Sequence, residues 1–209
     1  MRLQPFFVDA DGRRLNVGQP GALDFFRGAT AQALKEENWE LAEALSRETL
    51  RGCVALGEPA EATLTAHANV GAVLQRAGKL EAAVDVAQRV ALKRSEVLGQ
   101  AHPTTLRSVL ALAIYLREAR GEQDEEAALL SADVTRAAHE VLPAVLRATR
   151  DAGTLHGAFD LASLFVELGQ PQDAVPLLRE VLQAWRESLG SSPRHPEVCT
   201  QTCRAAQPG

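Results

Sequence analysis

Apolar residues recur along most of this chain at the spacing of an α-helix. In one stretch, Leu64, Val70, Val73 and Leu74 fall on one face of a predicted helix that ends at Gly78. A glycine just past a helix tolerates the left-handed backbone that closes many helices. The next predicted helix carries the apolar stripe Ala83, Val86, Val90 and Val97 and closes at Gly99. Together the two segments predict a helix hairpin.

The same marks recur near the end of the chain. Gly169 takes the place of Gly78, Ala174 takes the place of Ala83, and Leu189 precedes a closing glycine. The first helix of this unit is filled by Leu155, Leu161, Leu164 and Phe165. The agreement runs without a gap from residue 155 to residue 190, so we interpret it as a second copy of one structural unit.

A short motif between the predicted hairpins is also repeated. Residues 98–106 (LGQAHPTTL) share leucine, glycine, threonine and leucine with residues 56–64 (LGEPAEATL), 42 residues earlier. Leu-Gly and His-Pro return at 189–190 and 195–196 with two extra residues between them. A fixed period of this size is typical of stacked units that bury one another's apolar faces. The sequence therefore predicts an all-α helical repeat array.

Two further units fit the pattern less closely. The third has Leu106, Leu112, Ala113 and Leu116 before Gly121, and Ala127 in the small-residue position. After Leu142 and Pro143 no closing glycine follows, so we expect a longer linker up to Gly153, with room for an extra helical turn, and a local change in superhelix angle. In the first unit Asn38 replaces the turn glycine, and we expect it to adopt the left-handed conformation that asparagine tolerates.

The repeat domain is predicted to span residues 22–196, as units of approximately 22–62, 63–103, 104–153 and 154–196. Residues 1–21 form a separate arm, in which two short apolar runs flank Asp9-Ala10-Asp11-Gly12. This pattern predicts a β-hairpin or an extended arm. A calcium loop is the alternative, but the further oxygen ligands and the terminal glutamate are missing. Residues 197–209 are expected to be a flexible tail.

Composition and charge narrow the classes of partner. The hydrophobic fraction is 46% and the aromatic fraction only 4%, which suits close packing of helices. The net charge of −5 counts against a nucleic-acid partner, since binding phosphates needs a concentrated basic surface. No apolar run approaches the roughly 18 residues of a membrane span, and the first residues are too soon charged for a signal peptide. Three cysteines, Cys53, Cys199 and Cys203, form no disulfide framework, so we expect a cytoplasmic location.

The repeated motif resembles a known family. Leu-Gly, His-Pro-x-Thr-x-x-Leu, a small residue seven before a turn glycine and an alanine five after it are similar to the 42-residue tetratricopeptide repeat of the kinesin-light-chain type, over residues 23–196. The resemblance implies a right-handed superhelix of about four antiparallel helix pairs. It also implies a concave surface, lined mainly by first helices, that holds peptide segments of partner proteins.

The resemblance does not carry the family's peptide specificity with it. Family members carry paired asparagines in the first helix, and Asn69 matches one of them. The corresponding positions of the other three units are Ala29, Ala111 and Asp160. The side chains that select a ligand therefore differ in this chain.

Catalytic chemistry is not expected. His102 and His195 precede proline at the repeat junctions, where we expect them to cap helices, and His67 takes a position that predicts a half-buried core histidine. His139 and His156 have no nucleophile nearby in sequence. Phosphate-binding, hydrolase, zinc-protease and dinucleotide motifs are lacking, so we predict a non-enzymatic protein with no catalytic residues and no cofactor.

Two polar clusters have competing interpretations. His195, Cys199 and Cys203 are spaced by four and offer three soft ligands, but a structural zinc site needs four, so no metal is expected. The acidic run 122–126 follows Gly121 at a predicted helix start, where negative charge complements the helix dipole. A docking patch for a basic partner segment is the alternative for this run.

The predicted function is that of an interaction scaffold or adaptor that captures a protein or peptide partner in the concave groove. A regulatory subunit that controls an associated enzyme is the alternative, and the oligomeric state is left open. If first helices line the groove, the polar residues that face a partner are Asn69, Arg76, Arg107, Arg117 and Asp160. The competing interpretation is that these five are ordinary solvated surface residues.

Overall fold

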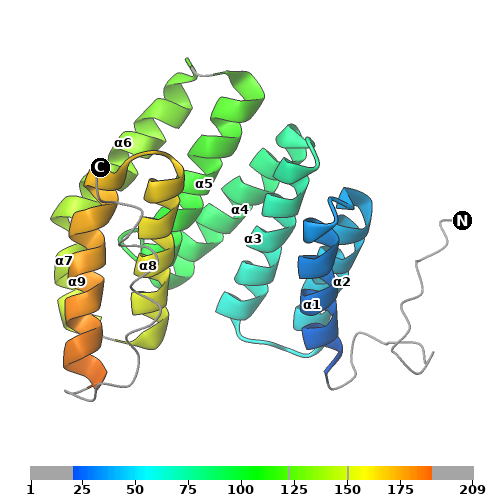
Figure 1. Ribbon diagram of the computed structural model, residues 1–209, viewed down its shortest axis with the longest axis horizontal. Helices are drawn as coiled ribbons and strands as arrows, with labels where there is room; N and C mark the ends of the chain where they lie inside the picture. The colour runs from blue at the N-terminus through cyan, green and yellow to red at the C-terminus, as the bar shows by residue number, and fades with distance from the viewer. Residues whose placement is uncertain (1–20, 122, 150, 190–209) are drawn as a thin grey trace, which may run out of the picture.

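The computed structural model describes residues 21–121, 123–149 and 151–189 (Figure 1). Every regular element in this part of the chain is an α-helix, which confirms the predicted all-α repeat fold. The helices are α1 (Ala22–Lys35), α2 (Trp39–Ala55), α3 (Ala60–Arg76), α4 (Leu80–Leu98), α5 (Pro103–Arg120), α6 (Glu125–Glu140), α7 (Leu142–Thr149), α8 (Ala152–Glu167) and α9 (Pro171–Leu189). The predicted N-terminal arm, the tail and the possible ligands His195, Cys199 and Cys203 lie outside the described residues.

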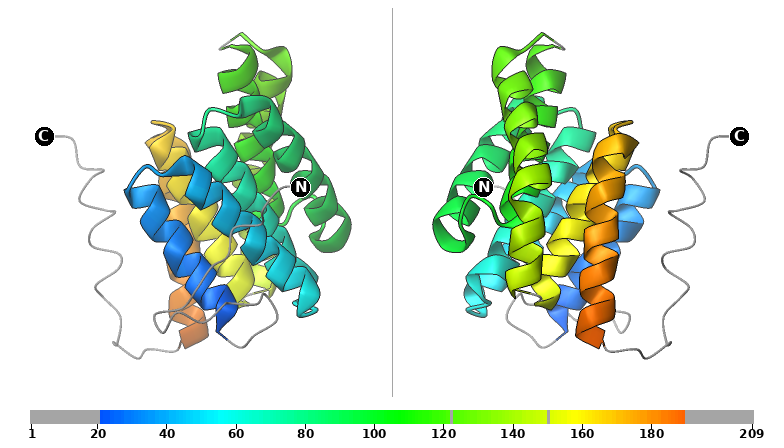
Figure 2. Two further views of the ribbon diagram at one scale, coloured as in Figure 1. Left: turned by 90° about the vertical axis from the view of Figure 1, so that its right-hand side faces the viewer. Right: turned by 90° about the vertical axis from the view of Figure 1, so that its left-hand side faces the viewer.

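Four helix hairpins lie side by side in chain order. They are α1–α2, α3–α4, α5–α6 and α8–α9, with α1–α2 at one end and α6 to α9 at the other (Figures 1 and 2). The first helices of the last three hairpins begin at Ala60, Pro103 and Ala152, slightly before the predicted unit starts at 63, 104 and 154. The predicted right hand of the superhelix stays a prediction.

Small residues allow the paired helices to approach closely. Ala83 in α4 and Ala174 in α9 are both fully buried, as their place in the repeat predicts. Neighbouring hairpins also share their cores: Leu23 of α1, Cys53 of α2 and Ala66 of α3 belong to one apolar cluster. Each hairpin is therefore stabilised by its neighbours as well as by the packing of its own two helices, as in other repeat arrays.

The turn residues follow the predicted pattern in two units and depart from it in one. Gly78 and Gly169 adopt positive φ values of 73° and 71°. In the first unit the left-handed residue is Glu37, with φ 55°, and Asn38 has φ −87°. The prediction for Asn38 was wrong by one residue because its side chain is needed as the N-cap of α2, where its Oδ1 accepts from the Leu41 N–H at 3.2 Å.

The inner face of α4 also differs from the prediction at one position. Val97 was assigned to the apolar stripe, but it is 56% exposed. Arg94, four residues after Val90 on the same helical face, takes the inward position and is only 2% exposed. Val97 lies in the last turn of α4, which ends at Leu98, and its side chain is exposed there.

The linker after the third unit is helical. Where a longer connection with an extra turn was expected, the structure has the eight-residue helix α7. Leu142 and Leu146 of this helix are fully buried in the core shared by α5, α6, α8 and α9. Helix α7 therefore packs between α6 and α9 and contacts both of them.

Helix α8 joins the array differently from the earlier first helices. α3 packs on α2, and α5 packs on α4. Outside its own hairpin, α8 packs mainly on α5 and has little contact with α6. The closest approach is at Gly157, where an added Cβ would lie 2.5 Å from Thr104 Cγ2 and 3.4 Å from Pro103 Cβ. A glycine is required here because any side chain would push the two helices apart.

We expect Gly157→Ala to lower the free energy of unfolding by about 1 to 2 kcal/mol, because overpacking at the α5–α8 contact outweighs the better helix propensity of alanine. Gly28→Ala is the matched control, since Gly28 is also helical but has open space around its Cα. It should raise stability by about 0.5 to 1 kcal/mol. Chemical denaturation of both variants tests the pair, and equal effects would contradict the close packing.

A second pair of variants tests the turn between α1 and α2. Glu37→Gly should raise the free energy of unfolding by roughly 0.5 to 1 kcal/mol, because the left-handed backbone is costly for a residue with a Cβ. Glu36→Gly should lower it by a similar amount, since Glu36 has φ −85° and gains nothing from glycine. Thermal melts that shift in the same direction for both variants would contradict this assignment.

Candidate functional site

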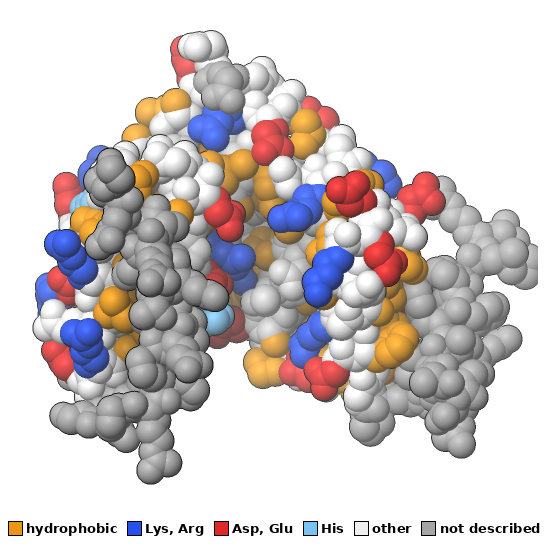
Figure 3. Space-filling model, in the orientation of Figure 1, with side chains coloured by type: hydrophobic (Ala, Val, Ile, Leu, Met, Phe, Trp, Pro, Cys, Tyr) orange, Lys and Arg blue, Asp and Glu red, His pale blue; other side chains and the backbone are white. Residues whose placement is uncertain are grey.

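A hollow lies between the first and the last hairpins. The cavity has a volume of about 500 Å³ and is bounded by α1, α3 and the start of α8 (Figure 3). Its lining residues are Arg27, Thr49, Pro59, Glu61, Ala62, Thr65, Ala66, Asn69 and Gly153. We call this cavity the groove. Most of its lining comes from first helices, as expected from the repeat pattern.

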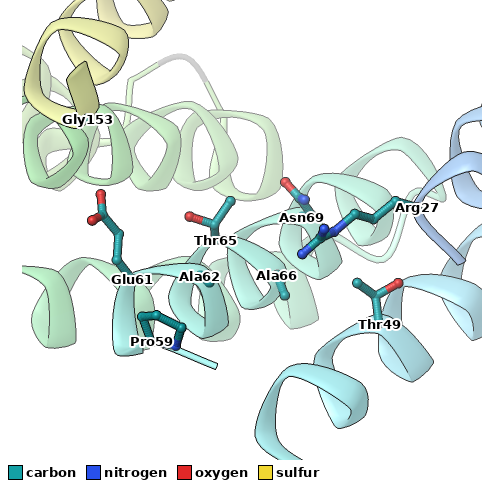
Figure 4. Close-up of a pocket in the computed structure, with 9 residues that line it drawn as sticks. All are labelled: Arg27, Thr49, Pro59, Glu61, Ala62, Thr65, Ala66, Asn69 and Gly153. Carbon is teal, nitrogen blue, oxygen red and sulfur yellow. The ribbon is translucent and has the colours of Figure 1, made fainter. Parts of the chain in front are cut away.

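Helix α3 presents a row of polar side chains to the groove. Glu61, Thr65 and Asn69 are spaced by four residues, so they lie on one face of the helix (Figure 4). At a rise of 1.5 Å per residue, successive members are about 6 Å apart along the axis. All three side chains are exposed to the groove. Ala62 and Ala66 beside them leave room for a ligand.

Two residues of the first hairpin form the wall beyond Asn69. The Arg27 side chain extends from α1 toward Asn69, and Thr49 of α2 lies below it (Figure 4). Arg27 also forms an exposed ion pair with Asp24, at 3.3 Å, on its own helix. Such an exposed pair contributes little energy, so the guanidinium can exchange it for a ligand group.

A buried arginine lies beneath the row on α3. Arg94 reaches from α4 between α3 and α5, where Nη2 donates to Thr65 Oγ1 at 2.9 Å and Nη1 donates to Ser108 Oγ at 2.7 Å. Within the described residues Arg94 has no carboxylate partner in ion-pair distance, and its Nε has no hydrogen-bond partner. Burial, and then the nearby Arg107, lower the pKa of Arg94, although an arginine stays charged.

The contact with Arg94 sets the role of the Thr65 hydroxyl. A hydroxyl has one donor and two acceptor positions. Because Thr65 Oγ1 accepts from the guanidinium, its own hydrogen is available to a hydrogen-bond acceptor in the groove. Thr65 is therefore best suited to bind a carbonyl or carboxylate oxygen.

One of the five predicted site residues lines the groove, and two others form an ion pair outside its lining. Asn69 is part of its lining. Arg107 of α5 and Asp160 of α8 form an ion pair at 3.7 Å across the α5–α8 contact, and His156 Nε2 lies 3.9 Å from the same carboxylate. Both partners of the Arg107–Asp160 pair are about one third exposed, so they remain accessible.

The other two predicted residues are placed elsewhere. Arg76 is exposed at the end of α3, and Arg117 is half-buried near the end of α5. Neither belongs to the groove lining. Gln75 and Glu118 connect the helices at this end, with Nε2 donating to the carboxylate at 2.8 Å. The structure therefore does not bring all five predicted residues together.

Several groove residues were missed by sequence reasoning. Glu61 and Thr65 could have been found, because they precede Asn69 by eight and four residues on one helical face. Arg94 also carried a signal, since it interrupts the buried stripe of α4. Nothing in the sequence indicated Arg27 and Gly153, because only the curvature of the array brings α1 and α8 to the same cavity.

The histidine and acidic clusters have mainly structural roles. His102 is the N-cap of α5, as predicted, and Nδ1 accepts from the Thr104 N–H at 3.3 Å. His67 is half-buried, and burial followed by the charges of Arg89 and Arg47 lowers its pKa. In the acidic run, Asp124 caps α6 by accepting from the Ala127 N–H at 2.8 Å. This confirms a helix N-terminus at residues 124–126.

The described residues contain neither a cluster of metal-binding side chains nor a membrane-spanning helix. Within residues 21–121, 123–149 and 151–189 no group of three His, Cys, Asp or Glu side chains is placed to hold a metal ion. None of the helices in the same residues has both the length and the hydropathy to cross a membrane.

The comparison with protein families agrees with the repeat architecture in two segments. The tetratricopeptide repeat family matches residues 63–104 and 160–197, on the second and fourth predicted units. Among solved structures, "kinesin light chain nearly identical TPR-like repeats" from Podosopora anserina match at 17% identity with a TM-score of 0.44, over 87% of this chain and 81% of that chain. No curated protein matches the chain. Repeats of this family generally serve protein interaction. Two segments of this array of stacked helix hairpins, residues 63–104 and 160–197, are therefore similar to tetratricopeptide repeats.

Proposed function

We propose that the chain is a non-catalytic adaptor that captures an extended segment of a partner protein in the groove. The observation that carries this proposal is the row Glu61, Thr65 and Asn69 on α3. Its spacing of about 6 Å is close to the spacing of alternate residues in an extended chain, roughly 6.6 Å. Successive groups of the row can therefore contact every second residue of such a segment.

The chemistry of the row suits a peptide backbone. Asn69 offers both a donor and an acceptor through its amide, and Thr65 offers a donor because Arg94 occupies one of its acceptor positions. Glu61 adds an acceptor, and Arg27 adds donors from the opposite wall. A main chain presents N–H and C=O groups in alternation, so it can satisfy this set without a particular side-chain sequence.

Basic and acidic groups are mixed at the groove. Arg27 carries the positive charge of the lining, and Glu61 carries the negative charge. The balance favours a segment of mixed or low net charge over one that is strongly acidic or basic. The regulatory alternative uses the same groove and differs only in its partner. A single enzyme that co-purifies in fixed ratio would support that alternative.

Variants of the α3 row test the proposal. A ligand is first selected from a displayed library of random peptides on the immobilised parent chain. Asn69→Ala and Thr65→Val should each weaken its binding by about 1 to 3 kcal/mol, measured by calorimetry, because each removes hydrogen bonds from the groove. The melting temperature of Asn69→Ala should stay unchanged, since this side chain is exposed.

Gln88→Ala is the matched control, an exposed amide on the second helix α4. It should bind the selected peptide as the parent does. Proline scanning of the peptide tests its conformation, because an extended segment accepts proline at positions whose N–H is not bound, whereas a helix does not. Parental affinity in both α3 variants, together with weaker binding by Gln88→Ala, would place the ligand on the opposite face.

A further inference from the structure

The groove carries opposite charges at its two ends. Glu61 of α3 lies toward one end of the lining, with Gly153 of α8 beyond it, and Asn69 and Arg27 lie toward the other end (Figure 4). Of the lining residues that the structure describes, only Glu61 and Arg27 are charged. The groove therefore has a direction, from a carboxylate at the start of α3 to a guanidinium that extends from α1.

The Glu61 carboxylate is available to a partner. Its side chain is exposed, and it has no hydrogen bond or ion pair with another described residue. The charge of Arg94 acts on it, but the Arg94 guanidinium donates to Thr65 and Ser108 instead. Arg94 is only 2% exposed, so a ligand cannot touch it. The group that a partner contacts at this end is therefore the carboxylate of Glu61.

Asp151 adds a second carboxylate beside the same end. An added Cβ on Gly153 would lie 3.2 Å from Asp151 Oδ1, so this exposed carboxylate borders a residue of the lining. The hydroxyl and the backbone N–H of Thr154 both donate to it, and these hydrogen bonds lower the pKa of Asp151. It is therefore ionised at neutral pH. A basic side chain that reaches Glu61 meets acceptors on two sides.

At the other end Arg27 is held only by a weak competitor. Its Nη1 lies 3.3 Å from Asp24 Oδ1, and the two side chains are 51% and 85% exposed. Because a pair this exposed is weak, a partner carboxylate can replace Asp24. A guanidinium binds a carboxylate through two N–H groups, and the amide of Asn69 beside it offers a further donor.

The separation of the two ends fits a fixed number of partner residues. Glu61 and Asn69 are eight residues apart on α3, which is about 12 Å along the helix axis. In an extended chain, residues four apart lie on the same face at about 13 Å from each other. The residue midway between them then meets Thr65. A separation of three or five would place the second side chain on the opposite face.

We propose that the groove selects a segment with a basic residue opposite Glu61 and an acidic residue, four positions away, opposite Arg27. This charge pattern rests on the proposed function of the groove and adds the chemistry of the partner to it. Either order of the two residues fits, since an extended segment can lie along α3 in both directions.

Selection from a displayed library of random nine-residue peptides tests the charge pattern. Groove ligands are identified as those that bind the parent chain and lose binding to Asn69→Ala. They should carry a basic and an acidic residue at a separation of four more often than at three or five. Moving the acidic residue of a selected peptide by one position should weaken its binding to the parent roughly three- to tenfold.

Reversal of each charge in the groove should reverse the charge of the ligand. Glu61→Lys should enrich peptides with two acidic residues four apart, and Arg27→Glu should enrich peptides with two basic residues. A peptide selected on the parent should bind each single variant roughly three- to tenfold more weakly. Exchange of the matching charge in the peptide should restore its affinity. Asp24→Asn should strengthen binding about twofold, because it removes the competitor of the ligand.

Two control variants match the reversed residues. Glu81 is exposed and is the second residue of α4, as Glu61 is the second residue of α3, so reversal has the same cost at the helix N-terminus. Arg136, like Arg27, forms an exposed ion pair with an aspartate three residues before it. Neither control residue belongs to the groove lining. Glu81→Lys and Arg136→Glu should select the same ligands as the parent does.

The charge pattern and the proposed function fail in different ways. Ligands that depend on Asn69 but show no preference for a separation of four would overturn the charge pattern and leave the groove as a peptide site. Unchanged ligand charges on Glu61→Lys and Arg27→Glu would do the same. If no enriched peptide depends on Asn69, the proposed function is wrong and the charge pattern is wrong with it. The shifted peptide is measured on the parent chain, so this test does not depend on how well a variant folds.

Discussion

No hairpin of this chain can bury its apolar face alone, and the rest of the structure depends on that constraint. The apolar clusters cross from one hairpin to the next: Val84 and Ala87 of α4 pack with Leu112 and Leu116 of α5. A core of this kind grows along the array and leaves a continuous outer surface on both sides. The groove is a consequence of this stacking, since its lining comes from three different hairpins through α1, α2, α3 and α8.

The α5–α8 contact is the point where the regular stacking changes. The helix α7 occupies the space beside α6, so α8 packs on α5 instead. Gly157 permits this approach because Thr104 and Pro103 occupy the space of a side chain. The last hairpin is thereby turned so that Gly153 faces α3 across the groove. An irregular linker thus determines the shape of the surface that the regular repeats present.

Repetition made much of the fold predictable. Gly78 and Gly169 mark the same turn in two units, and a motif that recurs in a fixed frame constrains every helix between its copies. Positions that depart from the repeat were harder to predict. Asn38 and Glu37 exchange roles because one residue must cap the next helix, which single-residue propensity does not reveal. Long-range neighbours such as Arg27 and Gly153 are set only by the packing of whole hairpins.

The sequence indicated a helix of the candidate site, but it did not indicate most of the side chains that determine its chemistry. Asn69 was found because it matches one of the paired asparagines of the family that the sequence resembles, but the residue that shapes the surface beside it is Arg94, on a different helix. A buried arginine without an ion pair is costly unless its hydrogen bonds are satisfied. Here Thr65 and Ser108 accept two of them, and the carboxylates of Glu61 and Asp160 lie near enough to raise the pKa that burial lowers.

This placement has a consequence for recognition. Arg27 and Glu61 line the groove and Arg94 lies beneath it, so charges of both signs are close together and their fields partly cancel at a distance. For the partner segment that we propose, we expect selection by short-range hydrogen bonds from Thr65 and Asn69 more than by attraction of net charge. Hydrogen bonds of this kind are effective only when both walls hold their spacing, since a shift of the α8 wall changes which groups reach the ligand. Under the proposed function, the packing of α8 against α5 therefore affects recognition as well as the fold.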